Sequence, residues 1–259
     1  MTNQEILKIA MAQSAVDLSA DASDFEKSEN VVVTSHEIDG VRRYLDLPFS
    51  CQLVSYGNNA VASVLPEFRE ITENYINKYP VEHLFETPHL HALNEALMAK
   101  GQKICFMAKY FLPDPKALHP LDCPYELRLL TPRDFADRYR PAWSNALCER
   151  RKELDVLGMG AYDGDSLVGL AGCSADCDTM WQIGVDVLPA YRKQGIASAL
   201  TSRLAIEILK RGKVPFYCAA WCNIRSVRNA IRSGFRPAWV EMTAKPIEYV
   251  DDMNQTAKR

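Results

Sequence analysis

The sequence contains no long, uninterrupted apolar segment. A membrane-spanning helix needs about 18 or more consecutive apolar residues, and Lys, Arg, Asp or Glu interrupts every apolar run before that length. At the N-terminus, Glu5 and Lys8 break the apolar stretch that a signal peptide requires. Thr2 and Glu5 instead have the spacing of a helix capping box. We therefore expect a cytoplasmic protein whose first helix belongs to the fold, with no membrane partner.

The chain also lacks an excess of positive charge. It has 30 Lys and Arg residues against 33 Asp and Glu residues, a net charge of −3 and an isoelectric point near 6.0. Proteins that bind nucleic acid usually present a basic face, so we expect no nucleic acid partner. The composition is not of low complexity either, because 47% hydrophobic and 24% charged residues are ordinary proportions for a globular protein.

The cysteines and histidines do not follow a metal-binding pattern. The sequence has no Cys-x-x-Cys, and all five histidines lie at or before position 119. Two cysteine pairs, Cys173/Cys177 and Cys218/Cys222, share a spacing of four residues, but both lie in strand-like segments where cysteine behaves as a small apolar residue. We expect no metal site, and we expect reduced thiols in a cytoplasmic protein.

A proline-rich segment divides the chain. Four prolines fall within residues 112–124, and proline resists both helix and central strand. Because 259 residues are enough for two domains, we place a boundary in this segment and predict domains at 1–120 and 121–259. The first domain has short strand-like and helix-like segments that predict a smaller α+β domain, but it has no motif that indicates a role.

The pattern after residue 120 is sharper. It predicts the order β-α-β-β-β-α-β-α-β, in which the first helix begins at Thr131 and Pro132 and the last strand covers residues 235–243. The longest helix covers about residues 195–211 and has one apolar stripe that faces a sheet. The stripe consists of Ile196, Leu200, Leu204 and Ile208.

The segment that precedes this helix has the features of an anion site. Residues 192–197 present successive backbone N–H groups at a helix N-terminus, where these groups are unpaired and the helix dipole is positive. Gly195 permits a phosphate to approach closely, and Arg192 and Lys193 add positive charge. An ordinary strand–helix turn explains the same residues equally well. Further along, Asn223 and Ser226 open a short helix and, taken alone, are capping residues.

Together these two segments resemble the GNAT N-acetyltransferase superfamily. Residues 192–197, Arg-Lys-Gln-Gly-Ile-Ala, match its Q/R-x-x-G-x-G/A motif, and Asn223-x-x-Ser226 followed by Gly234-Phe235 resembles its next motif at the expected distance. The resemblance covers about residues 125–243. It implies an α+β fold with a mixed, mostly antiparallel sheet flanked by helices. It also implies an enzyme that transfers the acetyl group of acetyl-CoA to a primary amine of a small molecule or peptide.

The resemblance further implies which residues bind acetyl-CoA as co-substrate. The pyrophosphate is expected on the loop before the long helix, and the pantetheine arm is expected along the preceding strand. Gly184 fits a strand that leaves its neighbour, because a strand glycine often marks a bulge or a close backbone approach. Arg225 and Arg228 are candidates for the nucleotide phosphate, with a solvated helix face as the alternative. The implied binding residues are Val185, Val187, Arg192, Lys193, Gln194, Gly195, Ile196, Ala197, Asn223 and Ser226.

Two positions depart from the family's pattern. Gln182 stands where many members have a Glu that acts as a base, and Ala230 stands where many have a Tyr that protonates the leaving thiolate. Neither side chain transfers a proton. Asp186 is the remaining carboxylate on the implied cofactor strand and is our catalytic candidate, although we favour a structural role bonded to a neighbouring loop.

A second class of function stays open. A GNAT-like domain that binds acyl-CoA without turnover and passes the signal on is the alternative to an acetyltransferase. The sequence does not indicate the acceptor amine or the oligomeric state.

Overall fold

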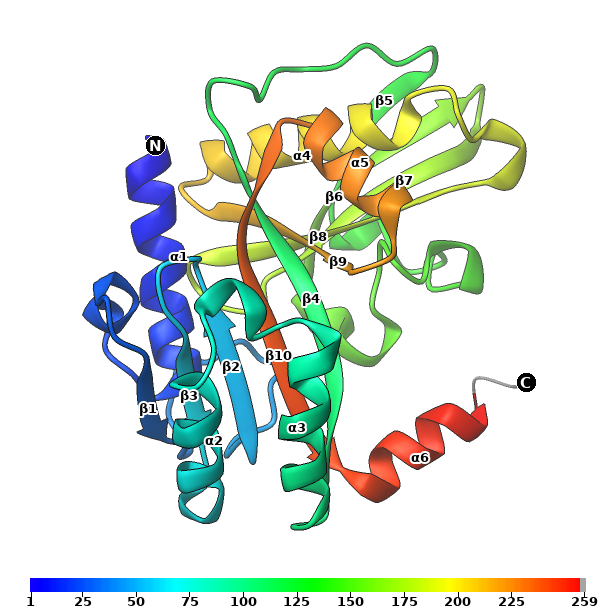
Figure 1. Ribbon diagram of the computed structural model, residues 1–259. Helices are drawn as coiled ribbons and strands as arrows, with labels where there is room; N and C mark the ends of the chain where they lie inside the picture. The colour runs from blue at the N-terminus through cyan, green and yellow to red at the C-terminus, as the bar shows by residue number, and fades with distance from the viewer. Residues whose placement is uncertain (257–259) are drawn as a thin grey trace. The chain divides into compact units, whose positions relative to one another are not determined.

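The computed structural model describes residues 1–256 and divides into two compact units (Figure 1). One, which we name the 110–237 unit, consists of Met1–Ala10 and Tyr110–Pro237; the other, the 11–109 unit, consists of Met11–Lys109 and Ala238–Arg259. We predicted consecutive domains at 1–120 and 121–259. The structure divides the chain differently, because one helix and two strands each run from one unit into the other. The last three residues of the second predicted domain lie outside the described residues.

A mixed sheet is the centre of the 110–237 unit. Strands β5 to β8 pair antiparallel in chain order, and β9 pairs parallel with β8. This is the mostly antiparallel sheet flanked by helices that the resemblance implied, so the α+β fold class is confirmed. The strands are β5 (Glu126–Leu130), β6 (Asp155–Asp163), β7 (Ser166–Ser174), β8 (Met180–Val187) and β9 (Val214–Ala220).

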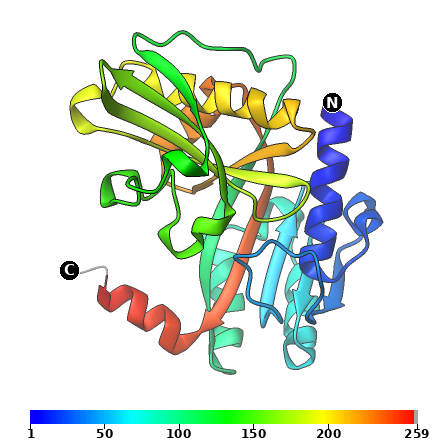
Figure 2. The same ribbon diagram turned by 180° about the vertical axis from the view of Figure 1, so that it is seen from behind.

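Helix α4 (Ile196–Lys210) covers one face of this sheet, and α5 (Ile224–Arg232) follows β9 (Figure 1). Figure 2, which shows the molecule from behind, has strands β5 to β8 in front of α4. The predicted apolar stripe of α4 is buried, with exposed fractions between 0% and 2%, and it packs against side chains of β6, β7 and β8. Burial of each such side chain contributes ~1.5–3 kcal/mol. The stripe therefore fixes the position of the N-terminus of α4 against the sheet.

The connection between β5 and β6 differs from our prediction of a helix that begins at Thr131. The structure has short 3-10 turns instead, and Arg140 adopts an extended conformation with φ −136° and ψ 155°. Phe135, Tyr139, Trp143 and Leu147 recur at a helical spacing of four residues. Pro141 falls within this stripe, however, and it removes a backbone N–H and disfavours helical geometry in the preceding residue. The connection, residues 131–154, therefore crosses the sheet as an irregular segment, which we name the strap.

The sheet of the 11–109 unit joins strands from both ends of the chain. Strands β1 (Val31–Thr34) and β3 (Val61–Val64) are parallel, and β2 (Cys51–Ser55) pairs antiparallel with β3. Strand β10 (Phe235–Pro246) pairs antiparallel with β2, and β4 (Gln102–Pro113) lies next to β10 in the strand order. The last strand of our predicted second domain is thus longer than expected and belongs mostly to this unit.

The helices of the 11–109 unit pack on this sheet through apolar side chains. Leu93 and Leu97 join Leu53 of β2 and Met242 of β10 in one buried core. None of the helices within residues 1–256 is both long enough and apolar enough to cross a membrane. The helices are α2 (Arg69–Ile76), α3 (Thr87–Met98) and α6 (Ile247–Thr256), together with the part of α1 (Asn3–Leu18) that follows residue 10.

Alternate side chains of β10 take part in a buried ionic cluster. Arg42 donates hydrogen bonds to Asp17 and, at 2.7 Å, to Glu241, and all three side chains are at most 6% exposed. The indole of Trp239 donates to the same Glu241 carboxylate at 2.7 Å. Two carboxylates that share one guanidinium are stable when buried only while every partner stays in place.

Candidate functional site

Strands β8 and β9 separate partway along their length. Their register pairs Met180 with Val214 and continues only to Gln182 and Phe216. Strand β8 nevertheless stays paired with β7 as far as Val187. The sheet therefore opens between β8 and β9 towards the N-terminus of α4, which is the splay that the resemblance implied.

The start of α4 is shaped by two residues with left-handed backbone conformations. Gly195 is the N-cap residue with φ 82°, and Lys193 has φ 66°. Glycine adopts such a conformation at little cost, whereas other residues pay about 1–2 kcal/mol. The first residues of α4, Ile196 to Ser198, line the opening. Arg192 closes the turn on the other side, since its Nε donates to the carbonyl oxygen of Val187 at 3.0 Å.

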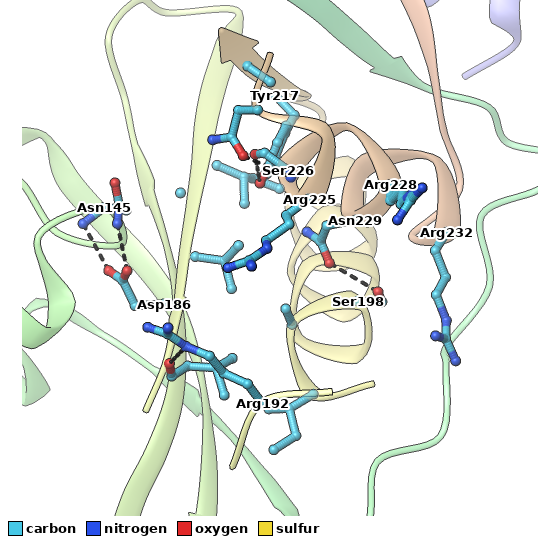
Figure 3. Close-up of a pocket in the computed structure, with 18 of the residues that line it drawn as sticks. Asn145, Asp186, Arg192, Ser198, Tyr217, Arg225, Ser226, Arg228, Asn229 and Arg232 are labelled. Atoms are coloured by element: carbon cyan, nitrogen blue, oxygen red, sulfur yellow. Dashed lines mark hydrogen bonds between the residues drawn. The ribbon is translucent and has the colours of Figure 1, made fainter. Parts of the chain in front are cut away.

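A pocket of about 820 Å³ fills the opening and lies wholly within the 110–237 unit (Figure 3). The structure brings together in its lining every predicted cofactor-binding residue except Gln194, and also Asp186. The Gln194 side chain instead accepts a hydrogen bond from the Tyr125 hydroxyl at 3.1 Å. The predicted residues that line the pocket are Val185, Val187, Arg192, Lys193, Gly195, Ile196, Ala197, Asn223 and Ser226.

The lining is strongly cationic. Arg225, Arg228 and Arg232 of α5 add to Arg192 and Lys193, and Figure 3 shows the three arginine side chains projecting from α5. Their spacing of three and four residues puts them on one helical face. The Arg232 guanidinium would lie 3.8 Å from a Cβ at Gly195. These five cations outnumber the single carboxylate of the lining, Asp186, and a cleft with an excess of one sign of charge attracts ligands of the opposite sign, so this pocket suits a polyanion.

Asp186 supports the wall of the pocket. Its carboxylate accepts hydrogen bonds from the Asn145 backbone N–H at 2.8 Å, from the Asn145 side-chain amide at 2.6 Å and from the Ala146 N–H at 3.0 Å. Figure 3 shows the two side chains facing each other at one side of the pocket. This is the contact with a neighbouring loop that we favoured for Asp186.

A row of glycines lets the strap lie flat on the sheet. Gly158, Gly172 and Gly184 are paired across β6, β7 and β8. A Cβ on Gly184 would overlap the Asn145 carbonyl, and one on Gly172 would overlap the Ala146 carbonyl. The register runs through Gly184 without a shift, so this glycine marks a close backbone approach rather than a bulge.

The two positions that depart from the family's pattern have other roles in the structure. Gln182 donates a hydrogen bond from Nε2 to the Cys218 sulfur at 3.0 Å. Ala230 is completely buried in the core between α4, α5 and the sheet and does not line the pocket. Among the residues that line the pocket, Asp186 is the only carboxylate, and none is a histidine.

Asn223 and Ser226 form the cap that begins α5. The Asn223 side chain accepts a hydrogen bond from the Ser226 backbone N–H at 3.2 Å. The Ser226 hydroxyl lies 2.7 Å from the hydroxyl of Tyr217 on β9. Burial raises the pKa of Tyr217, and the hydrogen bond with Ser226 opposes that rise.

The sequence did not predict all of the lining residues, and Asn145, Tyr217 and Arg232 are among those that it missed. Asn145 lies in the irregular strap, whose path the sequence does not reveal, and Tyr217 has the alternation of any buried strand residue. Arg232 had a usable signal, because it stands seven residues after Arg225 and four after Arg228 on the same helix.

Within residues 1–256, no group of three or more His, Cys, Asp or Glu side chains is arranged to hold a metal ion.

Comparison with known proteins places these features in a family. A model of the GNAT acetyltransferase family matches residues 101–238, which is more than half of the chain. No curated protein matches the chain.

Solved structures show similar but distant folds. A chain assigned to the GNAT acetyltransferase family from Novosphingobium aromaticivorans is 18% identical with a TM-score of 0.45; the match covers 56% of this chain and 66% of that one. A GNAT-family acetyltransferase from Colwellia psychrerythraea is 16% identical with a TM-score of 0.43, over 58% of this chain and 61% of that one. A GCN5-related N-acetyltransferase from Sphaerobacter thermophilus is 15% identical with a TM-score of 0.45, over 94% and 93%. The first two are matched over less than two thirds of their own length.

The match of the family model spans the splayed strands, the loop before α4 and helix α5, which together form the pocket. The chain belongs to the GNAT acetyltransferase family.

Proposed function

We propose that the 110–237 unit transfers the acetyl group of acetyl-CoA to a primary amine of a small molecule or peptide, by direct attack of the amine while both substrates are bound. Membership of the family supports acyl transfer in general. The observation that carries the finer proposal is the continuous pocket that joins the opening between β8 and β9 to the glycine-containing start of α4.

The phosphate end of the pocket fits coenzyme A. Beside the position of a Cβ on Gly195, only the Arg232 guanidinium lies within 4 Å, so the space in front of the loop is open. A pyrophosphate there meets the helix N-terminus together with the Arg192 and Lys193 cations. Arg225 and Arg228 remain for the phosphate on the ribose. The five cations of the lining match a ligand with several phosphate charges.

The opening between the strands fits the arm that joins the phosphates to the thioester. Beyond Gln182, the described register gives β8 no partner on β9. Backbone N–H and C=O groups on that edge, from Ile183 to Val187, are therefore available to the amides of the arm. Val185 and Val187 also pack against the core beneath α4, which holds this edge rigid.

Bound acetyl-CoA supplies an acyl group activated as a thioester. A backbone N–H of β8 at the point of separation would polarise the thioester carbonyl and stabilise negative charge on its oxygen. Asn145 of the strap bounds the pocket beside β8. Positioning of two reactants lowers a barrier by ~7–11 kcal/mol, so a dedicated base is not required when the amine arrives deprotonated.

One observation favours the alternative, a module that binds acyl-CoA without turnover. The only carboxylate in the lining, Asp186, is already engaged by Asn145 and Ala146. The pocket therefore offers no free carboxylate that could act as a base, which fits a module that binds acyl-CoA without turnover.

Binding and turnover, measured separately, distinguish the two. Calorimetric titration with CoA and acetyl-CoA tests the site, and release of free thiol from acetyl-CoA with a panel of primary amines tests the reaction. The enzyme requires binding and amine-dependent thiol release, whereas a sensor shows binding alone. No binding of either ligand would contradict both functions.

A further inference from the structure

Two hydroxyl groups meet at one end of the pocket. Phe216 is the last residue of β9 that pairs with β8, and Tyr217 follows it at the point where the two strands separate. The Tyr217 side chain is 5% exposed, and its hydroxyl lies 2.7 Å from that of Ser226. Figure 3 shows this pair at one end of the pocket and Arg192 at the other.

The length of the pocket sets which end receives the thioester. The segment from Val187, beside the phosphate loop, to Ile183, opposite Tyr217, covers four strand steps, or ~13 Å. The arm of coenzyme A contains two amide linkages and is about as long as three to four extended residues, ~10–14 Å. An arm that starts on the loop therefore ends with its sulfur near Ile183 and Tyr217.

We infer that the Tyr217 hydroxyl is the proton donor to the thiolate that leaves when the thioester is cleaved, and that Ser226 orients this hydroxyl. This inference rests on the proposed function. It assigns a group to the step for which Ala230 replaces the tyrosine that many family members use.

Two other hydroxyl groups in the lining are directed elsewhere. Tyr191 donates to Asp163 at 3.0 Å, and Ser198 donates to the Asn229 side chain at 3.0 Å. The Cys218 sulfur accepts a hydrogen bond from Gln182, and a thiol is only a weak donor. Tyr217 of β9 and Ala230 of α5 belong to the same buried core. The tyrosine ring therefore comes from the strand, and the helix contributes only the methyl group of Ala230.

The step is balanced in atoms and charge. The amine nitrogen forms a bond to the carbonyl carbon, and the carbon–sulfur bond breaks with its electron pair on sulfur. Tyr217 transfers its proton to that sulfur, and the proton released by the nitrogen returns to Tyr217 by way of water or the Ser226 hydroxyl. Because burial raises the pKa of Tyr217, the hydroxyl carries the proton that this step requires at neutral and mildly alkaline pH.

Tyr217→Phe is the direct test because it removes only the hydroxyl. Tyr162→Phe is the matched control, since Tyr162 is a buried strand tyrosine of the same sheet, 8% exposed, that does not line the pocket. Ser226→Ala removes the orienting hydroxyl. Each variant is compared with the wild type in kcat for an amine that the panel identifies, and in affinity for CoA and for desulfo-CoA, which lacks the sulfur.

The expected result is a kcat that falls by ~10²–10⁴-fold in Tyr217→Phe, with a smaller fall in Ser226→Ala and none in Tyr162→Phe. Affinity for CoA should fall about fivefold in Tyr217→Phe while affinity for desulfo-CoA stays constant, because only CoA offers the sulfur contact. An acyl donor with a more acidic thiol should restore most of the lost rate.

Each other outcome has one meaning. An active wild type with an unchanged kcat in Tyr217→Phe overturns the inference and leaves the proposed function standing. A wild type that binds CoA without turnover refutes the proposed transfer, and equal effects of Tyr217→Phe on CoA and desulfo-CoA then also exclude the hydroxyl–sulfur contact. A wild type that binds neither ligand overturns both proposals.

Discussion

Gly195 adopts a left-handed conformation at the start of α4, in front of open space in the pocket. A bulky side chain there would occupy the position assigned to the pyrophosphate. We predict that Gly195→Tyr weakens CoA binding by about 100-fold or more, ~2.7 kcal/mol, in calorimetric titration.

Gly212 provides the matched control for this substitution. It also has a left-handed conformation, φ 72°, beyond the other end of α4, with no atom within 4 Å of a Cβ. Gly212→Tyr should cost similar backbone strain, ~1–2 kcal/mol, and leave CoA binding unchanged. Equal affinities in the two variants would show that the phosphates do not sit on the loop.

The three hydrogen bonds that Asp186 accepts predict a structural role. Asp186→Ala should lower the free energy of unfolding by ~1–3 kcal/mol, because it leaves the Asn145 and Ala146 donors unpaired. In Asp186→Asn the pH–rate profile should keep its shape, since no catalytic proton is lost. A rate lower by ~10²–10⁴-fold with loss of the acidic limb would instead identify Asp186 as the catalytic base.

Asp155 predicts a pH dependence of stability. It is 2% exposed and accepts a hydrogen bond from the Cys148 N–H at 2.9 Å, and burial raises its pKa to about 6. Because the folded-state pKa lies above the unfolded one, the contribution of Asp155 to stability is fully present below about pH 4. It is lost as pH rises through 6.

Asp155→Asn should remove this dependence and make the protein more stable than the wild type at pH 7, by on the order of 1–3 kcal/mol. Denaturant unfolding of both proteins at pH 4, 5, 6 and 7 measures the difference in their free energies of unfolding. Asp134 supplies a control of opposite sign, because hydrogen bonds from Thr131 lower its pKa. A constant difference between wild type and Asp155→Asn across this range would show that Asp155 titrates normally.

At the scale of elements, β10 links the C-terminal part of the sequence to the 11–109 unit. It contributes Met242 to the apolar core and Glu241 to the ionic cluster around Arg42. We predict that Arg42→Ala lowers the free energy of unfolding by ~3–5 kcal/mol, because two carboxylates lose their shared partner. The exposed neighbour Arg43 is the matched control, and Arg43→Ala should change stability by less than about 0.5 kcal/mol. Similar losses in both variants would contradict a special role for the buried cluster.

The sequence predicted the individual helices and strands better than it predicted which strands pair with each other. The stripe on α4 and the strands around it followed directly from periodicity, because helix and sheet patterns are local. The pairing of β10 with β2 connects residues nearly two hundred positions apart, and no local pattern encodes it. Pro141 interrupted a helical spacing that runs from Phe135 to Leu147, which left a strap where a helix was expected.

The candidate site was predictable in the same uneven way. The loop at residues 192–197 and the Asn223–Ser226 cap have local motifs, and the structure places most of them in one pocket. Asn145 and Tyr217 reach that pocket through the path of the strap and the separation of two strands. Both depend on tertiary packing, so the sequence offered no signal for them.

At the scale of the whole molecule, the family match covers residues 101–238, and most of the 11–109 unit lies outside it. The chemistry proposed here is assigned entirely to residues of the 110–237 unit. The central claim is therefore that this one pocket binds acetyl-CoA and passes its acetyl group to an amine.

The most direct test is to follow an isotopically labelled acetyl group from acetyl-CoA by mass spectrometry, with the amine panel and the full chain. We predict a labelled, acetylated amine and free CoA thiol in equal amounts from the wild type and from Gly212→Tyr, and neither product from Gly195→Tyr. Free thiol without an acetylated amine, or an acetylated amine formed equally well by Gly195→Tyr, would contradict the account.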